Sequence, residues 1–309
     1  MSDHKSIFKC IEEIENGIVR IEILFIMSKD DKYYLAKALE KNPPLLGLDL
    51  SNNSLGCLGA YYFADALEKN NTLTELDLSR NNIGDRGAEH IGEALWFNST
   101  LDFLIISDNN INASGAQFIA TGLMRNTSVT WIIMDTNNIG NVGAQAIATL
   151  LLTNTTLTMI VLSATNIGDL GAQAISTMLR TNKTLEVINL SSNDIGESGA
   201  QAFATALLLN STLTKLDLSF NKIGPLGIQA LAVAMSSNTT LVNFDFSCNK
   251  LVGAVRCNSV VLFEEYKIRN KALSYRDIMV AALICNSDFH IRLPDHILFY
   301  IFSFWQRKI

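Results

Sequence analysis

The stretch Leu73-Thr-Glu-Leu-Asp-Leu-Ser-Arg-Asn-Asn-Ile-Gly84 decides the fold, because it returns in nearly the same form as Leu213-Thr-Lys-Leu-Asp-Leu-Ser-Phe-Asn-Lys-Ile-Gly224. Both belong to a series that repeats every 28 residues without an insertion, and its first residues are Leu45, Leu73, Leu101, Val129, Leu157, Leu185, Leu213 and Leu241. A fixed period of this length is the sequence signature of a solenoid. The sequence therefore predicts seven full units over 45–240 and the opening of an eighth that runs to about Leu251.

Each unit combines a short strand with a helix. Positions 1, 4 and 6 are apolar, as in Leu73, Leu76 and Leu78, so alternate side chains of a strand point inward. Residues 88–95 then follow a helical spacing. One such unit cannot bury its apolar face alone, so the units must stack. The predicted fold is an α/β horseshoe with a concave parallel sheet and convex helices.

Position 9 of the unit is asparagine in seven of eight cases: Asn53, Asn81, Asn109, Asn137, Asn193, Asn221 and Asn249. An amide side chain carries two donors and one acceptor group, so stacked asparagines can satisfy backbone groups where the chain leaves the sheet. Thr165 is the exception, and we expect a local weak point there. On the helix, Gln117, Gln145, Gln173, Gln201 and Gln229 recur at one position, and we expect them to hydrogen-bond between neighbouring helices.

These repeats resemble leucine-rich repeats of the ribonuclease-inhibitor type. They are especially similar to the 28-residue repeats of NOD-like receptors and of leucine-rich effectors from intracellular bacteria. The resemblance covers about two-thirds of the chain, and it implies a solenoid that binds another protein on its concave face.

The two ends depart from the period. Residues 1–44 are expected to form an N-terminal capping unit before the repeats of 45–251, and residues 252–309 a helical C-terminal cap or tail. Within that tail, the segment 293–304 resembles the start of an F-box, which docks adaptors onto ubiquitin ligases. The matching residues are Leu293, Pro294, Ile297, Ile301 and Phe304.

Composition removes several classes of function. With 309 residues, 48% hydrophobic and 17% charged, the chain is too apolar for intrinsic disorder. Its net charge of −6 argues against a nucleic-acid partner, and no apolar run approaches the roughly 18 residues of a membrane span. Five scattered cysteines indicate free thiols in a cytoplasmic, reducing compartment. Catalytic motifs and metal-binding patterns are absent from the sequence, so we expect no enzyme, no metal and no cofactor.

The outward positions 3 and 5 of the predicted strands hold the candidate partner-binding residues. The central strands carry an apolar set, and acidic residues border it: Phe103, Ile105, Trp131, Ile133, Met159, Val161 and Val187, with Glu75, Asp77 and Asp217. An exposed apolar patch with a polar rim is typical of a protein-binding site. Two alternatives remain: the apolar residues stabilise the sheet, or the tail folds over them.

The sequence thus favours a non-enzymatic interaction module, with a bacterial effector acting in a host cytosol as the preferred setting. A eukaryotic intracellular regulator is the other setting. One alternative function is a ubiquitin-ligase adaptor that uses the F-box-like tail. Another is a GTPase-activating protein similar to the leucine-rich activators of Ran, for which Arg80 and Arg86 are the residues of interest.

Overall fold

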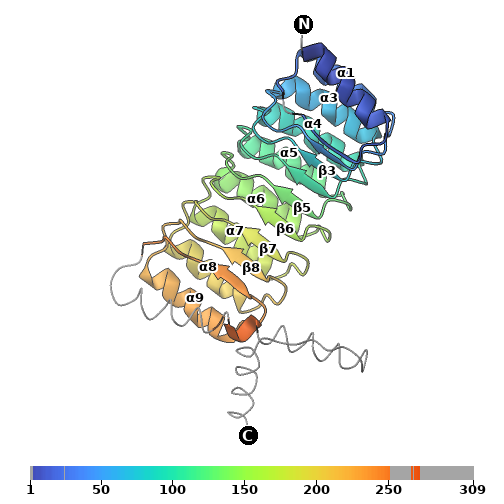
Figure 1. Ribbon diagram of the computed structural model, residues 1–309. Helices are drawn as coiled ribbons and strands as arrows, with labels where there is room; N and C mark the ends of the chain where they lie inside the picture. Colours follow the sequence, from blue (N-terminus) through green and yellow to red (C-terminus); the bar gives the residue numbers. More distant parts are fainter. Residues whose placement is uncertain (1–2, 24, 251–265, 267, 272–309) are drawn as a thin grey trace, which may run out of the picture.

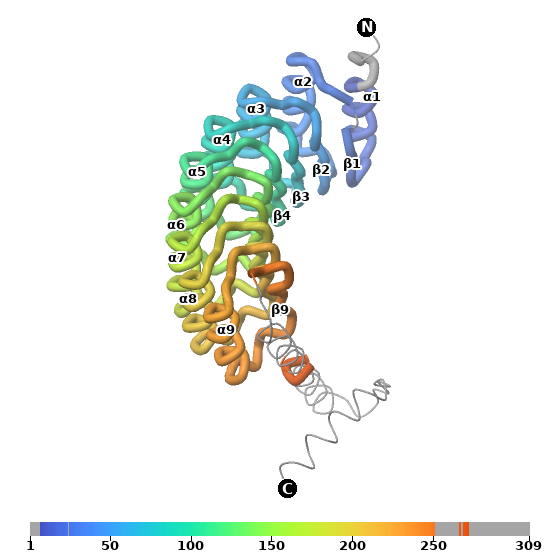
Figure 2. Tube along the Cα trace, turned by 90° about the vertical axis from the view of Figure 1, so that its left-hand side faces the viewer, coloured from blue at the N-terminus to red at the C-terminus, as the bar shows by residue number. Residues whose placement is uncertain are grey.

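The computed structural model describes residues 3–23, 25–250, 266 and 268–271, and it shows a curved solenoid (Figures 1 and 2). One parallel sheet contains nine strands in chain order: β1 (Arg20–Glu22), β2 (Gly47–Asp49), β3 (Glu75–Asp77), β4 (Phe103–Ile105), β5 (Trp131–Ile133), β6 (Met159–Val161), β7 (Val187–Asn189), β8 (Lys215–Asp217) and β9 (Asn243–Asp245). Figure 2 shows the strands on the inner side of the curve and the helices on the outer side. The predicted horseshoe is confirmed for this part of the chain.

The convex layer consists of helices that alternate with the strands. Their bounds are α1 (Asp3–Glu15), α2 (Lys29–Leu39), α3 (Gly56–Lys69), α4 (Gly84–Phe97), α5 (Ala113–Leu123), α6 (Gly140–Leu151), α7 (Asp169–Leu179), α8 (Glu197–Leu207) and α9 (Pro225–Ser237). None of the helices in the described residues is long and apolar enough to cross a membrane. The division of the chain at residues 44 and 251 stays a prediction, and most of the predicted C-terminal cap lies outside the described residues.

The 28-residue period sets the register of the sheet. From β2 onward each strand residue pairs with the residue 28 positions later, as Leu48 does with Leu76. Between β1 and β2 the offset is 27, because Ile21 pairs with Leu48 in the less regular first unit. The inward leucines and isoleucines of β2 to β8 and Phe244 of β9 are buried against the helices, and Ile21 of β1 is half-buried. A continuous apolar core therefore runs along the solenoid between its two layers.

Every strand from β2 to β9 is followed by a residue with a left-handed backbone at position 8 of the unit. These residues are Asn52, Arg80, Asp108, Thr136, Ala164, Ser192, Phe220 and Cys248, with φ between 51° and 57°. A left-handed residue other than glycine costs about 1 kcal/mol. The next residue of the unit, the ladder asparagine, offsets this cost by fixing the turn.

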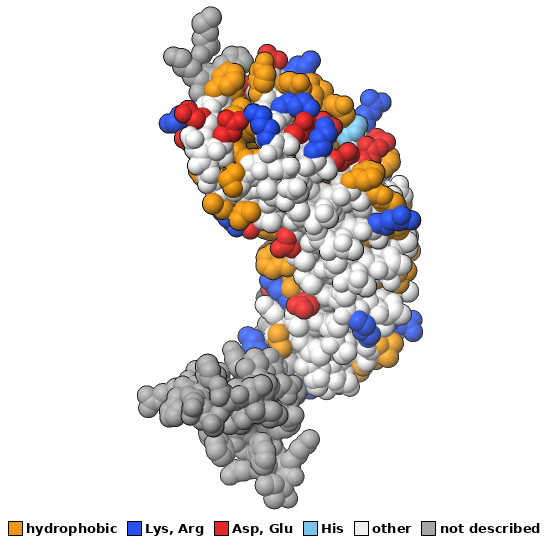
Figure 3. Space-filling view, turned by 90° about the vertical axis from the view of Figure 1, so that its right-hand side faces the viewer, with side chains coloured by type: hydrophobic (Ala, Val, Ile, Leu, Met, Phe, Trp, Pro, Cys, Tyr) orange, Lys and Arg blue, Asp and Glu red, His pale blue; other side chains and the backbone are white. Residues whose placement is uncertain are grey.

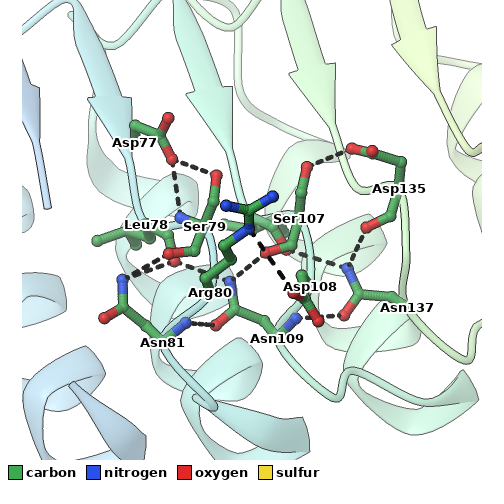
Figure 4. A network of polar contacts seen from close by, with 11 residues as sticks. Asp77, Leu78, Ser79, Arg80, Asn81, Ser107, Asp108, Asn109, Asp135 and Asn137 are labelled. Carbon is green, nitrogen blue, oxygen red and sulfur yellow. Dashed lines mark hydrogen bonds and ion pairs between the residues drawn. The ribbon is translucent and has the colours of Figure 1, made fainter. Parts of the chain in front are cut away.

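The asparagine ladder links each turn to both neighbouring units (Figure 4). Asn81 is buried, and its Nδ2 donates to the carbonyl of Leu50 in the preceding unit at 2.8 Å and to that of Leu78 at 2.9 Å. Its N–H donates to Oδ1 of Asn109 in the following unit at 3.0 Å. One side chain therefore satisfies buried backbone groups that no strand or helix pairs. The ladder expected from the sequence is present.

Thr165 interrupts this ladder. Its hydroxyl donates to the carbonyl of Leu162 at 2.7 Å, but it offers no carboxamide oxygen to the preceding unit. In other units the backbone N–H two residues beyond the ladder residue donates to such an oxygen, as Ile111 does to Asn137 at 3.0 Å and Ile167 to Asn193 at 2.9 Å. Ile139 has no equivalent acceptor among the described residues.

A second column of buried asparagines follows the helices. Asn98 is typical: its Nδ2 donates to the carbonyls of Leu67 and Asn70, and its Oδ1 accepts from the N–H of Leu101. At the C-terminal end Asn270 continues the column, because it is buried and donates to the carbonyls of Asn238 and Leu241. The neighbouring Arg269 donates to the carbonyls of Met235 and Ser236 at the end of α9.

The prediction that the recurring glutamines form hydrogen bonds between neighbouring helices is wrong. The side chains of Gln117, Gln145, Gln173, Gln201 and Gln229 are exposed, and none of them forms a side-chain hydrogen bond within the described residues. One turn after the first four of these glutamines, a threonine hydroxyl donates to the backbone carbonyl of the glutamine, as Thr121 does to Gln117 at 2.8 Å. Water competes for these amides because the convex face is open to solvent.

Restoring the missing ladder member should stabilise the protein. In Thr165→Asn, the new Oδ1 can accept from the N–H of Ile139, and we expect the free energy of unfolding to rise by about 1 kcal/mol. Urea unfolding followed by circular dichroism measures this change. The matched control is Asn193→Thr, which removes the same group one unit later and should cost about 1–3 kcal/mol. A Thr165→Asn variant that unfolds at lower urea would contradict the role assigned to the ladder.

Candidate protein-binding surface

The predicted apolar residues meet on the concave side of four adjacent strands. In the register of the sheet, Phe103 pairs with Trp131, Trp131 with Met159, and Met159 with Val187. Ile105, Ile133 and Val161 form a second row. We call these seven residues the concave apolar cluster. Trp131 is exposed, and the other six are half-buried by their neighbours.

An aromatic pair forms the most prominent part of the cluster. The rings of Phe103 and Trp131 pack edge to face, with centroids 5.5 Å apart and an interplanar angle of 85°. Trp131 still keeps 45% of its surface exposed. Large aromatic side chains held in one orientation lose little conformational freedom on binding, which is why this pair is the candidate anchor of the predicted surface.

Acidic side chains border the cluster on its N-terminal side. Glu75 and Asp77 lie on β3 next to Phe103 and Ile105 of β4. Glu75 is not free, because Arg20 of β1 reaches across the intervening strand and forms an ion pair with it. The sequence reasoning missed Arg20, since the first strand departs from the regular period.

Asp217 does not join this acidic group. It lies on β8, beyond Asn189 of β7, and therefore borders the cluster on its opposite, C-terminal side. Neighbouring strands are about 4.8 Å apart, so five strand spacings put roughly 24 Å of sheet between Asp77 and Asp217. The predicted acidic residues are thus divided between two rims. Figure 3 shows the solenoid from its side, where the charged side chains gather over the N-terminal units and the middle of the molecule is largely uncharged.

A hollow of about 200 Å³ lies between the acidic residues and the cluster. Gly47 leaves the outward position of β2 without a side chain, and the hollow opens over it between Arg20, Asp49, Asp77 and Phe103. A glycine at a strand position where the other units carry side chains was the available sequence signal. The hollow extends the candidate surface from β4 back to β1.

Asp77 lines this hollow, and its surroundings disfavour the charged form of its carboxyl group. Burial raises the pKa of its carboxyl above the ordinary value of 3.8, and the nearby Asp49 adds to the shift. The N–H and hydroxyl of Ser79 donate to the carboxylate and partly offset the effect. On β7 the equivalent position holds the neutral Asn189, whose side-chain oxygen accepts the corresponding hydrogen bond from the N–H of Ser191 at 2.8 Å.

This arrangement predicts a pH-dependent effect of Asp77→Asn. The folded state holds the proton of Asp77 more tightly than the unfolded state, so the wild-type protein loses stability as the pH rises from about 4 through the folded pKa. The asparagine of the variant is neutral and can keep the bond from Ser79. We expect the variant to gain stability relative to the wild type between pH 4 and pH 7, measured by urea unfolding. The burial effect would be contradicted if the wild-type protein became more stable relative to the variant as the pH rises.

The geometry of the described residues offers little for catalysis. No group of three histidine, cysteine or acidic side chains is placed to hold a metal ion in this part of the chain. Arg80 points from the left-handed turn after β3 toward Asp108, with its Nε 3.8 Å from that carboxylate (Figure 4). The predicted docking residues Leu293, Pro294, Ile297, Ile301 and Phe304 lie outside the described residues.

Comparison with known families identifies the repeat. A family model described as Leucine Rich repeat matches six stretches, namely 69–92, 97–120, 125–148, 153–176, 181–204 and 209–232. Each match spans 24 residues of the 28-residue period and contains one strand, from β3 to β8, with the first part of the helix that follows it, from α4 to α9. These residues are therefore leucine-rich repeats, and the horseshoe is a leucine-rich repeat solenoid. Repeats of this kind are generally non-catalytic interaction modules, and no catalytic family is indicated.

Two solved structures show a similar course of the chain. One is titled leiomodin-1 actin-binding site 2; it has a TM-score of 0.47 and 23% identity, and the match covers 56% of this chain and 97% of that one. The other is the tropomodulin C-terminal domain from Caenorhabditis elegans, with a TM-score of 0.45, 14% identity, and coverage of 54% and 98%. No curated protein matches the chain. Neither likeness identifies a partner for this protein.

Proposed function

We propose that this protein is a non-enzymatic interaction module that binds a partner protein through the concave apolar cluster. The observation that carries the proposal is the edge-to-face pair of Phe103 with a Trp131 that remains 45% exposed at the centre of the sheet. Buried tryptophan and its neighbours dominate the energy of many protein interfaces. A partner that covers this pair would remove its remaining apolar surface from water.

The sheet itself supplies an argument against a purely structural role. At position 3 of the unit, Gly47, Glu75, Lys215 and Asn243 occupy the same register as Trp131. Their strands pair in the same parallel pattern as β4 to β7. The sheet therefore forms without apolar side chains at this position, which supports a binding role for those at its centre.

The test of this proposal compares two substitutions with a matched control. Trp131→Ala combined with Phe103→Ala should abolish capture of a partner from cell lysate, while the urea midpoint stays near the wild-type value. Leu170→Ala is the control, because Leu170 is exposed on the helix side at α7. If the double variant unfolds much more readily, the cluster stabilises the sheet; if capture survives, the partner binds elsewhere. Either result would reject the proposal.

The setting is inferred from the cysteines and from the resemblance of the repeats. Cys10, Cys57 and Cys248 are free thiols in the described part of the chain, as expected in a reducing compartment. We infer a cytoplasmic location, which would be the host cytosol if the chain is an effector of an intracellular bacterium. No observation favours a ubiquitin-ligase adaptor or a GTPase-activating protein over a plain interaction module.

A further inference from the structure

A second apolar groove lies on the helix side, between α4 and α5. Its volume is about 270 Å³. It is lined by Glu89, Gly92, Glu93, Trp96, Phe97, Phe118, Thr121 and Gly122. None of these residues belongs to the concave apolar cluster, so the groove is a separate surface.

Two glycines form the floor of the groove. A Cβ atom added to Gly122 would lie 2.0 Å from the carbonyl oxygen of Gly92, and one added to Gly92 would lie 2.5 Å from that of Phe118. Neither position tolerates a side chain, because the backbones of α4 and α5 touch there. The close contact leaves bare backbone at the bottom of the groove and aromatic side chains on its walls.

The walls expose an unusual amount of aromatic surface. Trp96, Phe97 and Phe118 remain 37%, 68% and 38% exposed, respectively. The guanidinium of Arg125 sits 4.9 Å from the centre of the Trp96 ring, which holds the ring in place by a cation–π contact. This contact favours one orientation of the Trp96 ring on the wall of the groove.

The other repeats show that the solenoid does not need this groove. The four full units after this pair carry glutamine and alanine at the positions of Glu89 and Phe118, and threonine or valine at the position of Glu93; examples are Gln145, Ala146 and Thr149, and Gln173, Ala174 and Thr177. The unit before the pair differs from both, with Tyr61, Tyr62 and Asp65 at these positions. Position 20 is alanine or serine in the other full units, where Gly92 replaces it. Those units stack in the same register without these residues. The packing of the repeats therefore does not explain why this pair of units carries Glu89, Glu93 and Phe118.

Negative charge surrounds the groove on the α4 side. Glu89 and Glu93 line it, and within the described residues neither forms an ion pair with a lysine or arginine; Glu93 is 3.7 Å from Nδ1 of His90. Burial raises the pKa of the nearby Glu68, the charges of Asp65 and Glu93 raise it further, and the charge of Lys69 lowers it. Asp65 is already paired with Lys69 and Lys37, so Glu89 and Glu93 are the carboxylates of the groove beside which a cation from a partner would find no competing lysine or arginine pair among the described residues.

We propose that the groove between α4 and α5 binds a short segment of a partner protein that inserts a large apolar side chain between Trp96 and Phe118 and places lysine or arginine beside Glu89 and Glu93. The apolar side chain matches the aromatic walls and the bare glycine floor. The basic residues match the carboxylates that have no lysine or arginine counterpart. This site is independent of the concave apolar cluster and does not require that its partner be the same protein.

A subtractive peptide selection tests the proposal on the full chain. A phage library of random dodecapeptides is selected on the wild-type protein in the presence of excess soluble Glu93→Lys/Phe118→Ala variant, which removes peptides that bind elsewhere. Synthetic versions of the surviving peptides are then measured by fluorescence anisotropy. We expect survivors that combine leucine or an aromatic residue with lysine or arginine, and binding that weakens at least about tenfold in Glu93→Lys alone.

Matched controls separate the groove from general effects of charge and fold. Thr149→Lys places the same charge at the same helix position two units later, and Trp131→Ala changes the concave side; both should bind the peptides as the wild type does. Circular dichroism and the urea midpoint show whether Glu93→Lys, an exposed position, stays folded. The proposal is overturned if no peptide survives, if the survivors lack basic residues, or if Thr149→Lys weakens binding as much as Glu93→Lys.

Discussion

Buried carboxamides hold neighbouring units together, and the rest of the structure depends on them. Each ladder asparagine donates from its Nδ2 to a carbonyl of the unit before it, and Asn53, Asn81 and Asn109 also donate from their backbone N–H to the asparagine of the unit after it, as Asn81 does with Leu50 and Asn109. The turn it fixes includes a left-handed residue after every strand from β2 to β9. An unsatisfied buried backbone group costs about 1–3 kcal/mol, so one side chain per unit decides whether the turn is stable. The regular sheet that carries the candidate surface follows from this repeated contact.

The uniform framework makes the exceptions in the chain informative. On the convex side, most units repeat glutamine, alanine and threonine at the same helix positions, and these residues suffice for stacking. Tyrosines lie side by side on α2 and α3, and large aromatic residues also depart from this background at the two candidate surfaces, on β4 and β5 and on α4 and α5. Each carries exposed aromatic surface beside carboxylates on the N-terminal side. The solenoid is therefore a regular scaffold on which a few side chains differ, and these side chains are the candidates for binding.

Much of the fold could be predicted from the sequence, because the period determines the register. The strand pairs from β2 to β9, the inward leucines and the asparagine ladder all follow from the 28-residue spacing. The features that could not be predicted involve contacts outside the period. Arg20 reaches Glu75 from a first strand with a different offset, and the approach of Gly92 to Gly122 depends on how two helices pack. The glutamine contacts were expected from spacing alone and fail because those amides face solvent.

The residues of the candidate surface could be predicted from the sequence, but its hollow and the burial of its side chains could not. Alternation along the strands gives the direction of Trp131, and the period gives its neighbours. The hollow over Gly47 is formed by side chains from four strands, and the pKa of Asp77 depends on burial and on Asp49 of the neighbouring strand, so neither can be predicted from one unit.

The central claim, that a partner protein sits on the concave apolar cluster, is tested most directly by site-specific photocrosslinking in cells. Benzoylphenylalanine is incorporated in place of Trp131 in one variant and in place of Leu170, on the helix side, in another. The account predicts that the variant at position 131 forms a discrete crosslinked species with one partner protein and that the variant at position 170 does not. The claim would be contradicted if position 131 gave no crosslink or if both positions captured the same protein equally.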